Sequence, residues 1–247
     1  MTQESLILSI DVGLKTMAMC CVSPVQPDKF EVKLWELYNM LEDDCDKTCQ
    51  SVTKKGTVCG KKCSYKYNTT LCCKTHVPKG TTGTALKHKK VKDYNLHTVA
   101  RAVISTLNKV YQENVATFSQ VQKIVIELQP KCNNKMKMVS HIIFGKLVDL
   151  LYNQSNVAIN FVRASQKLTA YSGPVIECKL KGEYARRKWM SVQHAQWFLE
   201  TRCSQSQEWL DKLKSHTKKD DIADALNMCM VELYKRKNNK RAFGFAV

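Results

Sequence analysis

The chain has 247 residues, of which 44% are hydrophobic and 25% charged, a balance that excludes disordered and membrane-embedded classes. Lysine and arginine total 39 against 22 aspartate and glutamate, so the formal net charge is +17. A chain this basic attracts polyanions by counterion release, and nucleic acid is the commonest such partner. A generally basic soluble surface and a lipid surface are the alternatives. No signal peptide opens the sequence and no apolar run reaches the ~20 residues that cross a bilayer, so we expect an intracellular protein without a membrane partner.

The first part of the chain predicts a strand meander followed by an insertion. Three apolar or alternating runs, at 5–11, 16–23 and 30–38, are typical of strands. The composition then changes to Cys, Lys, Thr and Gly over residues 42–83, which we interpret as an insertion. The main domain is therefore expected at 1–41 and 84–247.

Helices and strands alternate after the insertion. Apolar spacing predicts a helix over 87–111, and the run VQKIVIEL, stopped by Pro130, predicts a buried strand. A helix, a strand and a polar loop ending in SGP follow, and then an amphipathic helix and a last helix. The expected spans of the four regular elements are 141–152, 156–165, 183–200 and 221–234. This alternation predicts an α/β fold with a mixed sheet flanked by helices.

Four acids lie where a magnesium nuclease needs them. Asp11 ends the strand in SLILSIDVG, Glu127 ends QKIVIELQP, and Asp221 and Asp224 lie in KKDDIADAL. Magnesium prefers carboxylate oxygens and water, and two such ions can hold the attacking and leaving oxygens of a phosphodiester. Glu127 is surrounded by aliphatic residues, where a carboxylate is costly unless it is paired or metal-bound. We expect Gly13 to let the backbone turn close to a ligand.

Each of these acids also has a simpler explanation. Asp221 and Asp224 share a helix face, but acids near a helix start also serve as caps, with Asp220 as the candidate cap. Asp220 competes with Asp221 for the metal site, because positions 220 and 224 also share a face. The Asp11 turn resembles the phosphate turn of actin-like ATPases, but nine glycines offer no clear second phosphate loop. Taken together, the four acids favour phosphodiester chemistry.

SIDVG, IELQP and KKDDIADAL resemble the three motifs of RuvC-like Holliday junction resolvases, especially those of poxviruses and other large DNA viruses. The resemblance covers residues 5–38 and 87–235. It implies an RNase H-like fold, a homodimer, and symmetric cleavage of branched DNA, especially four-way junctions. It also implies that Asp11, Glu127, Asp221 and Asp224 are catalytic and hold two Mg²⁺ ions, for which Mn²⁺ is expected to substitute. Asp221 is preferred over Asp220 because its spacing matches the family.

Basic residues near the acids are candidates for DNA contact. Their individual role is expected to be phosphate contact that positions DNA without reading sequence, and no single catalytic lysine is chosen. They are Lys179, Lys181, Arg186, Arg187, Lys188, Lys218 and Lys219.

The insertion is expected to bind structural zinc. Six of the twelve cysteines lie in it, as two C-x3-C pairs followed by C-C-x-x-H. Tetrahedral zinc needs four such ligands, and a short segment without its own core gains its fold from them. The favoured set is Cys49, Cys59, Cys73 and His76, with Cys45, Cys63 and Cys72 as alternates. We expect the insertion to brace the sheet edge or, less favoured, to touch DNA arms. The other six cysteines are expected to be small buried hydrophobic residues.

The sequence thus predicts a junction-resolving, magnesium-dependent endonuclease. Two other functions are retained: an RNase H-type nuclease acting on RNA–DNA hybrids, and an inert zinc and DNA-binding scaffold. If the protein is viral, it is expected to act where viral DNA replicates. The basic tail at 235–241 could direct nuclear import or hold DNA, although a solvated charged end is its simplest interpretation.

Overall fold

The computed structural model describes residues 5–87, 89–130 and 132–234, so the basic tail lies outside the described residues. A five-stranded sheet of order β3-β2-β1-β7-β8 forms its centre. The first three strands are antiparallel, whereas β1, β7 and β8 run parallel, which confirms the predicted mixed sheet. The strands are β1 (Leu6–Val12), β2 (Thr16–Gln26), β3 (Lys29–Asn39), β7 (Val121–Leu128) and β8 (Ala158–Arg163).

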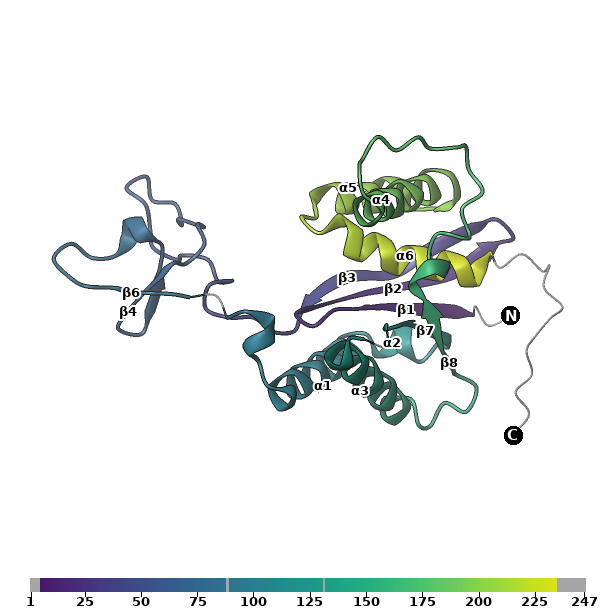
Figure 1. Ribbon diagram of the computed structural model, residues 1–247, viewed down its shortest axis with the longest axis horizontal. Helices are drawn as coiled ribbons and strands as arrows, with labels where there is room; N and C mark the ends of the chain where they lie inside the picture. Colours follow the sequence, from purple (N-terminus) through teal and green to yellow (C-terminus); the bar gives the residue numbers. More distant parts are fainter. Residues whose placement is uncertain (1–4, 88, 131, 235–247) are drawn as a thin grey trace.

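Helices cover both faces of this sheet (Figure 1). On one face lie α1 (Leu96–Glu113), the short α2 (Val115–Phe118) and α3 (Asn134–Leu150). On the other face lie α4 (Glu183–Arg202), α5 (Ser206–Ser215) and α6 (Lys219–Leu233). The sheet is therefore buried on both sides, as its nearly continuous apolar strands require.

Alternation along β1 assigns its side chains to the two layers. Ile10 is buried in the core under α1 and α3, whereas Ile7 belongs to the core under α6. The Ser9 hydroxyl, on the same face as Ile7, donates a 2.6 Å hydrogen bond to the carbonyl of Ala225 on α6. The indole of the buried Trp35 on β3 donates a 2.7 Å hydrogen bond to the carbonyl of Ile222. These bonds fix the first half of α6 against the sheet.

Three helices differ from the sequence prediction. Helix α1 begins at Leu96, nine residues after the predicted start, because the Asn95 side chain accepts from the amide of Thr98 and caps the helix there. Helix α3 begins at Asn134, capped in the same way by Asn133. Helix α5 was not predicted, because its ten residues are mostly polar and bury only Trp209, Leu210 and Leu213.

The insertion forms a small three-stranded sheet of order β5-β4-β6. Its strands are β4 (Tyr65–Tyr67), β5 (Thr70–Cys72) and β6 (Thr84–Ala85), with a 3₁₀ turn η1 at Lys74–His76. Because β6 pairs with β4, this sheet continues two residues past the predicted boundary at 83. The small sheet of the insertion stands away from the helices and the central sheet (Figure 1), so this part of the insertion does not brace the sheet edge as expected; Asp46, near the start of the insertion, contacts Lys15 in the turn between β1 and β2. Two further 3₁₀ turns are η2 (Val91–Asp93) and η3 (Ala164–Gln166).

The six cysteines outside the insertion behave differently from one another. Cys20, Cys21, Cys203 and Cys229 are buried as predicted, whereas Cys132 is exposed and Cys178 is partly exposed. Both exceptions lie outside the helices and strands, where no apolar layer covers them. No helix in the described ranges has the length and apolar character to span a bilayer.

Candidate functional site

The sheet brings Asp11 and Glu127 together. Strands β1 and β7 are parallel neighbours, so their carboxyl ends meet at one edge. Ser9 bonds to α6 and Val125 packs against α6, and each lies two residues before one of the acids. Since side chains alternate along a strand, Asp11 and Glu127 both face α6.

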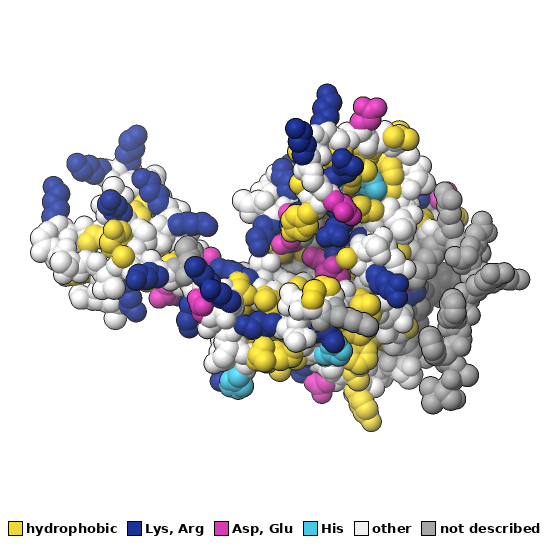
Figure 2. Space-filling view, in the orientation of Figure 1, with side chains coloured by type: hydrophobic (Ala, Val, Ile, Leu, Met, Phe, Trp, Pro, Cys, Tyr) yellow, Lys and Arg dark blue, Asp and Glu magenta, His cyan; other side chains and the backbone are white. Residues whose placement is uncertain are grey.

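Helix α6 supplies the remaining acids from its first turn and a half. Asp220, Asp221 and Asp224 line the same cavity of about 150 Å³ as Asp11 and Glu127. The space-filling view shows acidic side chains in a hollow of the main body, with basic side chains around it (Figure 2). The structure thus brings together all four sequence-predicted acids, together with Asp220.

Lys167 lies at the centre of three of these carboxylates. Its ammonium Nζ is 2.5 Å from Asp11 Oδ1, 2.9 Å from Glu127 Oε1 and 2.9 Å from Asp224 Oδ2. Only 6% of its side chain is exposed. A buried lysine of this kind is stable only because the acids surround it, and the acids tolerate burial because of the lysine.

The charges of the cluster are strongly coupled. Burial raises the pKa of Asp11 well above its usual range, and the nearby carboxylates of Glu127 and Asp224 raise it further, against the opposing effect of Lys167. Burial alone would lower the pKa of Lys167, but Asp11, Asp224 and Glu127 outweigh it and raise this pKa above its ordinary value. Lys167 is therefore a permanent cation at neutral pH.

Side chains behind the acids orient them. The amide of Gln129 donates a 2.9 Å hydrogen bond to Glu127 Oε2. On the other side, the Ser191 hydroxyl of α4 donates to Asp224 Oδ1, and the amide of Asn227 donates to Ser191 at 2.9 Å. These buried polar partners limit the rotation of the carboxylates.

The structure separates the environments of Asp220 and Asp221. Asp220 forms an ion pair with Lys188 of α4. Asp221 lies 3.7 Å from Lys218 and accepts a long 3.5 Å hydrogen bond from the Thr16 hydroxyl of β2. Burial raises the pKa of Asp221, and the charge of Asp220 adds to that effect. Asp221 is thus the less tightly paired acid of the two.

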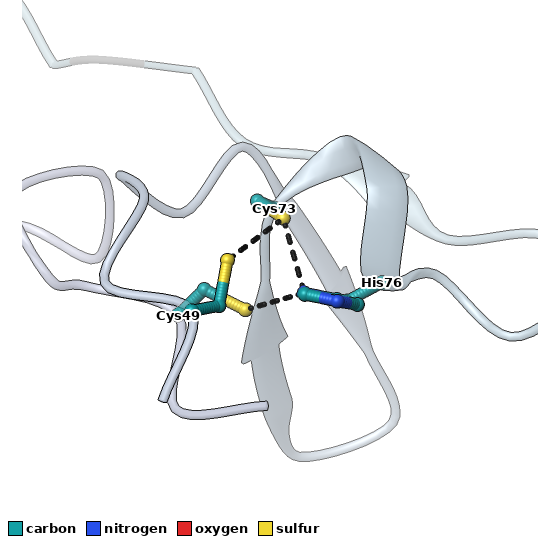
Figure 3. A group of neighbouring side chains, drawn as sticks. Cys49, Cys73 and His76 are labelled. Atoms are coloured by element: carbon teal, nitrogen blue, oxygen red, sulfur yellow. Dashed lines mark hydrogen bonds between the residues drawn. The ribbon is translucent and has the colours of Figure 1, made fainter. Parts of the chain in front are cut away.

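A second cluster lies in the insertion. The ligand atoms of Cys49, Cys59, Cys73 and His76 all lie within 4.8 Å of one another. The Sγ atoms of Cys59 and Cys73 are 3.8 Å apart, and His76 Nδ1 is 3.4 Å from the Sγ atoms of Cys49 and Cys73. The ligand edges of a tetrahedral zinc site with ordinary bond lengths are about 3.8 Å between sulfurs and about 3.6 Å between sulfur and nitrogen. The donor set therefore fits zinc, and Figure 3 shows Cys49, Cys73 and His76 pointing toward one another.

Two of the three thiols of this cluster, those of Cys49 and Cys73, favour the charged form that binds metal, whereas burial and the neighbouring thiols raise the pKa of Cys59 against a backbone hydrogen bond from Lys61. Burial raises the pKa of Cys49, but hydrogen bonds from Ser51, the backbone of Cys73 and His76 bring it down to about 6. Hydrogen bonding from Thr75 lowers the pKa of Cys73. Of the alternates, Cys63 and Cys72 are buried beside Cys49 in a small apolar cluster, whereas Cys45 lies outside this cluster. None of the three alternates joins the four-ligand group.

Residues 80–236 match the family model described as poxvirus A22 protein. The chain belongs to this family. It is the family of the poxvirus Holliday junction resolvases, which confirms the resemblance; the match includes IELQP and KKDDIADAL, whereas SIDVG lies before it. The match begins near the end of the insertion, so the family model does not account for its cysteines.

One viral protein and two solved structures are also similar to this chain. An uncharacterised protein, L451 of Acanthamoeba polyphaga mimivirus, is 28% identical over 202 residues, which are 73% of this chain and 47% of the relative. The chain thus spans about half the length of that curated relative. The yeast mitochondrial Holliday junction resolvase Ydc2 is similar in structure, with TM-score 0.52, 12% identity, and coverage of 94% of this chain and 80% of that one. This likeness confirms the RNase H-like fold. Thermus thermophilus RuvC, in complex with a Holliday junction substrate, has TM-score 0.48 at 10% identity, over 94% of this chain and 96% of RuvC.

Gly13 has a different role in this A22 family member from the one the sequence predicted. A Cβ atom at Gly13 would lie 2.4 Å from the carbonyl oxygen of Thr16, and Gly13 does not line the acidic cavity. The tight turn between β1 and β2 is by itself enough to require the glycine.

The predicted DNA-contacting residues lie at different distances from the acids. Arg187 and Lys188 line the acidic cavity, next to the exposed Tyr184. Lys218 reaches Asp221 from the start of α6, and Lys219 is the first residue of that helix. The remaining three are exposed and do not line the cavity: Lys179, Lys181 and Arg186.

Sequence reasoning missed Lys167 in this family member. The residue follows β8 in a stretch that was interpreted only as a loop. A signal was present, because β8 is the parallel neighbour of β7 and residues just after β8 reach the edge that holds Glu127. Sheet order was needed to use that signal, and the sequence alone does not state it.

Proposed function

We propose that this chain is a structure-selective, magnesium-dependent endonuclease that resolves four-way DNA junctions as a homodimer. The observation that carries the proposal is that three carboxylates contact the ammonium of Lys167 in a member of a Holliday junction resolvase family. These carboxylates belong to Asp11, Glu127 and Asp224. Asp221 is the fourth proposed catalytic acid. The high net positive charge supports a nucleic-acid substrate.

The donor set fits divalent metal. Three carboxylate oxygens contact the single Nζ of Lys167 at 2.5–2.9 Å, so one small cation can be contacted by all three acids together. Hard cations such as Mg²⁺ and Mn²⁺ prefer such oxygen ligands. Two bound ions would supply activation of the attacking water and neutralisation of the leaving oxygen. Asp11, Glu127, Asp221 and Asp224 would hold them.

The protein's own groups have separate tasks in this reaction. Gln129 and Ser191 fix the directions of Glu127 and Asp224, so the ligand geometry does not have to be organised during the reaction. Lys167 and Lys188 place positive charge in the floor and wall of the cavity, where a phosphate would enter. Lys167 is the proposed catalytic lysine because it already contacts the acids.

Cleavage assays with labelled substrates test this proposal. The purified protein is incubated with Mg²⁺ or Mn²⁺ and a four-way junction, a linear duplex, a flap, or an RNA–DNA hybrid, beside an Asp11→Asn control. We expect paired symmetric nicks near the junction that disappear in the control and without metal. Cleavage of the hybrid alone would identify an RNase H-type enzyme, and no cleavage at all would identify the inert scaffold. Light scattering would test the homodimer.

We further propose that Cys49, Cys59, Cys73 and His76 bind one structural zinc ion. A segment as small as the insertion has little apolar core, so the ion would supply much of its folding energy. Metal analysis of the purified protein tests this directly. Intracellular action during viral DNA processing follows from the family and remains part of the proposal.

A further inference from the structure

The insertion carries a strong and uncompensated positive charge. Between Lys47 and Gly83 the chain has eight lysines and no aspartate or glutamate. Lys47 is paired with Asp44 at 3.0 Å. In the part of the chain that the structure describes, the other seven are exposed and form no ion pair; they are Lys54, Lys55, Lys61, Lys62, Lys66, Lys74 and Lys79. Figure 2 shows several basic side chains on the visible face of the insertion, around a few hydrophobic ones.

The lysines are displayed on an ordered scaffold. Bridges between Thr48 and Lys62 and between Val52 and Val58 close a hairpin whose two sides carry Cys49 and Cys59. Lys54 and Lys55 stand at the tip of this hairpin. Val52 and Val58 are 65% and 57% exposed just below it, so the tip presents positive charge and apolar surface together. Backbone phosphates and sugars of nucleic acid match that pair of properties.

The insertion leaves the body at the edge of the sheet that holds the acids. Asn39, the last residue of β3, pairs with Thr16, which follows the turn after Asp11. The ammonium of Lys15 in that turn forms a 2.7 Å ion pair with Asp46 of the insertion, and the carbonyl of Lys15 accepts a 2.8 Å hydrogen bond from the amide of Met40. The basic insertion and the acidic cavity are therefore connected through one short turn.

The returning chain is also held at this edge. The ammonium of Lys135, in the first turn of α3, donates a 2.8 Å hydrogen bond to the carbonyl of Tyr94. Both connections to the insertion are thus held by contacts with the body, one to the turn that follows Asp11 and one to the start of α3.

We propose that the insertion is a duplex-binding module that holds one arm of the DNA by its phosphates, beyond the segment at the acidic cavity. The choice of arm rests on the proposed function, but duplex binding by the insertion does not require cleavage. Since phosphate contacts carry no sequence information, this binding is independent of sequence. Duplex binding by the insertion would lengthen the DNA segment that the protein contacts and raise the affinity for DNA, without taking part in cleavage.

Binding is tested with the full chain carrying Asp11→Asn, so that cleavage does not interfere. The test variant is K54Q/K55Q/K62Q, and the matched control removes three exposed charges from α1 and α5 as R101Q/K109Q/K214Q. On a linear duplex of about 30 base pairs, we expect the test variant to lose about tenfold or more in affinity. The slope of log binding constant against log salt concentration should become shallower by about 2 to 3, because three phosphate contacts disappear. The control should change both much less. Zinc content and the thermal midpoint verify folding.

Two further experiments separate the possible outcomes. The charge-preserving variant K54R/K55R/K62R should bind as the parent does. Junctions with arms of about 30 base pairs should show the loss, and junctions with arms of about one helical turn should show much less of it. Equal affinity of the test variant and the parent for the long duplex would overturn the proposal, as would an equal loss in the control variant. Selective loss of binding to single-stranded RNA or to anionic vesicles, with duplex binding intact, would also overturn it. Failure of the wild type to cut junctions would refute the proposed function and leave the duplex result standing.

Discussion

The ammonium of Lys167 lies 2.5 Å from Asp11 Oδ1, although 156 residues separate them in the chain. This contact joins the end of the first strand to the segment after the last one. Its one positive charge partly compensates the three carboxylates of Asp11, Glu127 and Asp224, so we expect both the stability and the proposed chemistry to depend on Lys167.

Replacing Lys167 by methionine should therefore abolish cleavage and weaken the fold. Loss of one partner from a buried ionic cluster costs about 3 to 5 kcal/mol, because uncompensated carboxylates are left behind. We expect divalent metal to restore part of that stability, since it replaces the lost positive charge. Thermal unfolding with and without Mg²⁺ measures this. A Lys167→Met variant that melts like the wild type in metal-free buffer would contradict the assigned role.

Asp220→Asn and Asp221→Asn should behave differently. Asp220 is paired with Lys188, so its loss should reduce cleavage modestly, by about tenfold or less. Asp221 is a proposed metal ligand, so its loss should reduce cleavage by about a hundredfold or more and raise the Mg²⁺ concentration needed. Metal titrations of single-turnover cleavage separate the two. The reverse order of effects would assign the site to Asp220.

His194 should make the fold sensitive to acid. Burial lowers its pKa to about 4, and its ring nitrogens have no hydrogen-bond partner among the described residues, while the ring stacks on Tyr171 at 3.9 Å. An unfolded histidine titrates near 6.5, so below that pH the unfolded chain binds the extra proton first. The contribution of the neutral His194 to the free energy of unfolding should be fully present above pH 6.5. The free energy of unfolding should then fall by about 1 to 3 kcal/mol as the pH drops toward 4. Denaturant midpoints against pH measure it.

Two variants isolate that effect. His194→Phe keeps an aromatic ring in the stack and should flatten the pH dependence between 4 and 6.5. His97→Gln removes an exposed histidine of α1 and should leave the curve unchanged. If His194→Phe retains the full wild-type slope, another group is responsible for the acid sensitivity.

Removal of zinc should unfold the insertion and spare the body. The main sheet has two large apolar cores of its own, whereas the insertion buries only a few residues around Cys49. We expect a chelator to make residues 42–83 protease-sensitive while the main thermal transition persists. Cys73→Ala should bring zinc content from about one ion per chain to near zero, and Cys132→Ala should not change it. An unchanged zinc content in Cys73→Ala would refute the ligand set.

Gly13→Ala should destabilise the turn between β1 and β2. The added Cβ would approach the Thr16 carbonyl to 2.4 Å, and backbone must move to accommodate it. Because Asp11 and Thr16 flank this turn, the variant should lose both stability, by about 1 to 3 kcal/mol, and cleavage rate. Unfolding midpoints and cleavage rates test this; wild-type stability in the Gly13→Ala variant would show that the turn can relax.

The sequence by itself determined the strands, the order of the motifs and the chemistry of the acids. Apolar runs, continuous or alternating, identified β1, β2, β3 and β7 within a few residues, since burial on both faces of the sheet leaves a strong local signal. The spacing of Asp221 and Asp224 predicted a shared helix face because helical periodicity is local. The C-C-x-x-H spacing likewise pointed to Cys73 and His76 as neighbours.

Only the tertiary structure decided how distant segments meet. The choice of Lys167 over seven other basic candidates depends on β8 lying beside β7, and strand order is a long-range property that no local pattern contains. The separation of Asp220 from Asp221 depends on where α4 places Lys188. The contact of Asp46 with Lys15 likewise joins the insertion to the turn between β1 and β2. Charge and residue spacing are local properties that can be read from the sequence. The energies of ion pairs and hydrogen bonds between distant residues depend on which segments folding brings into contact.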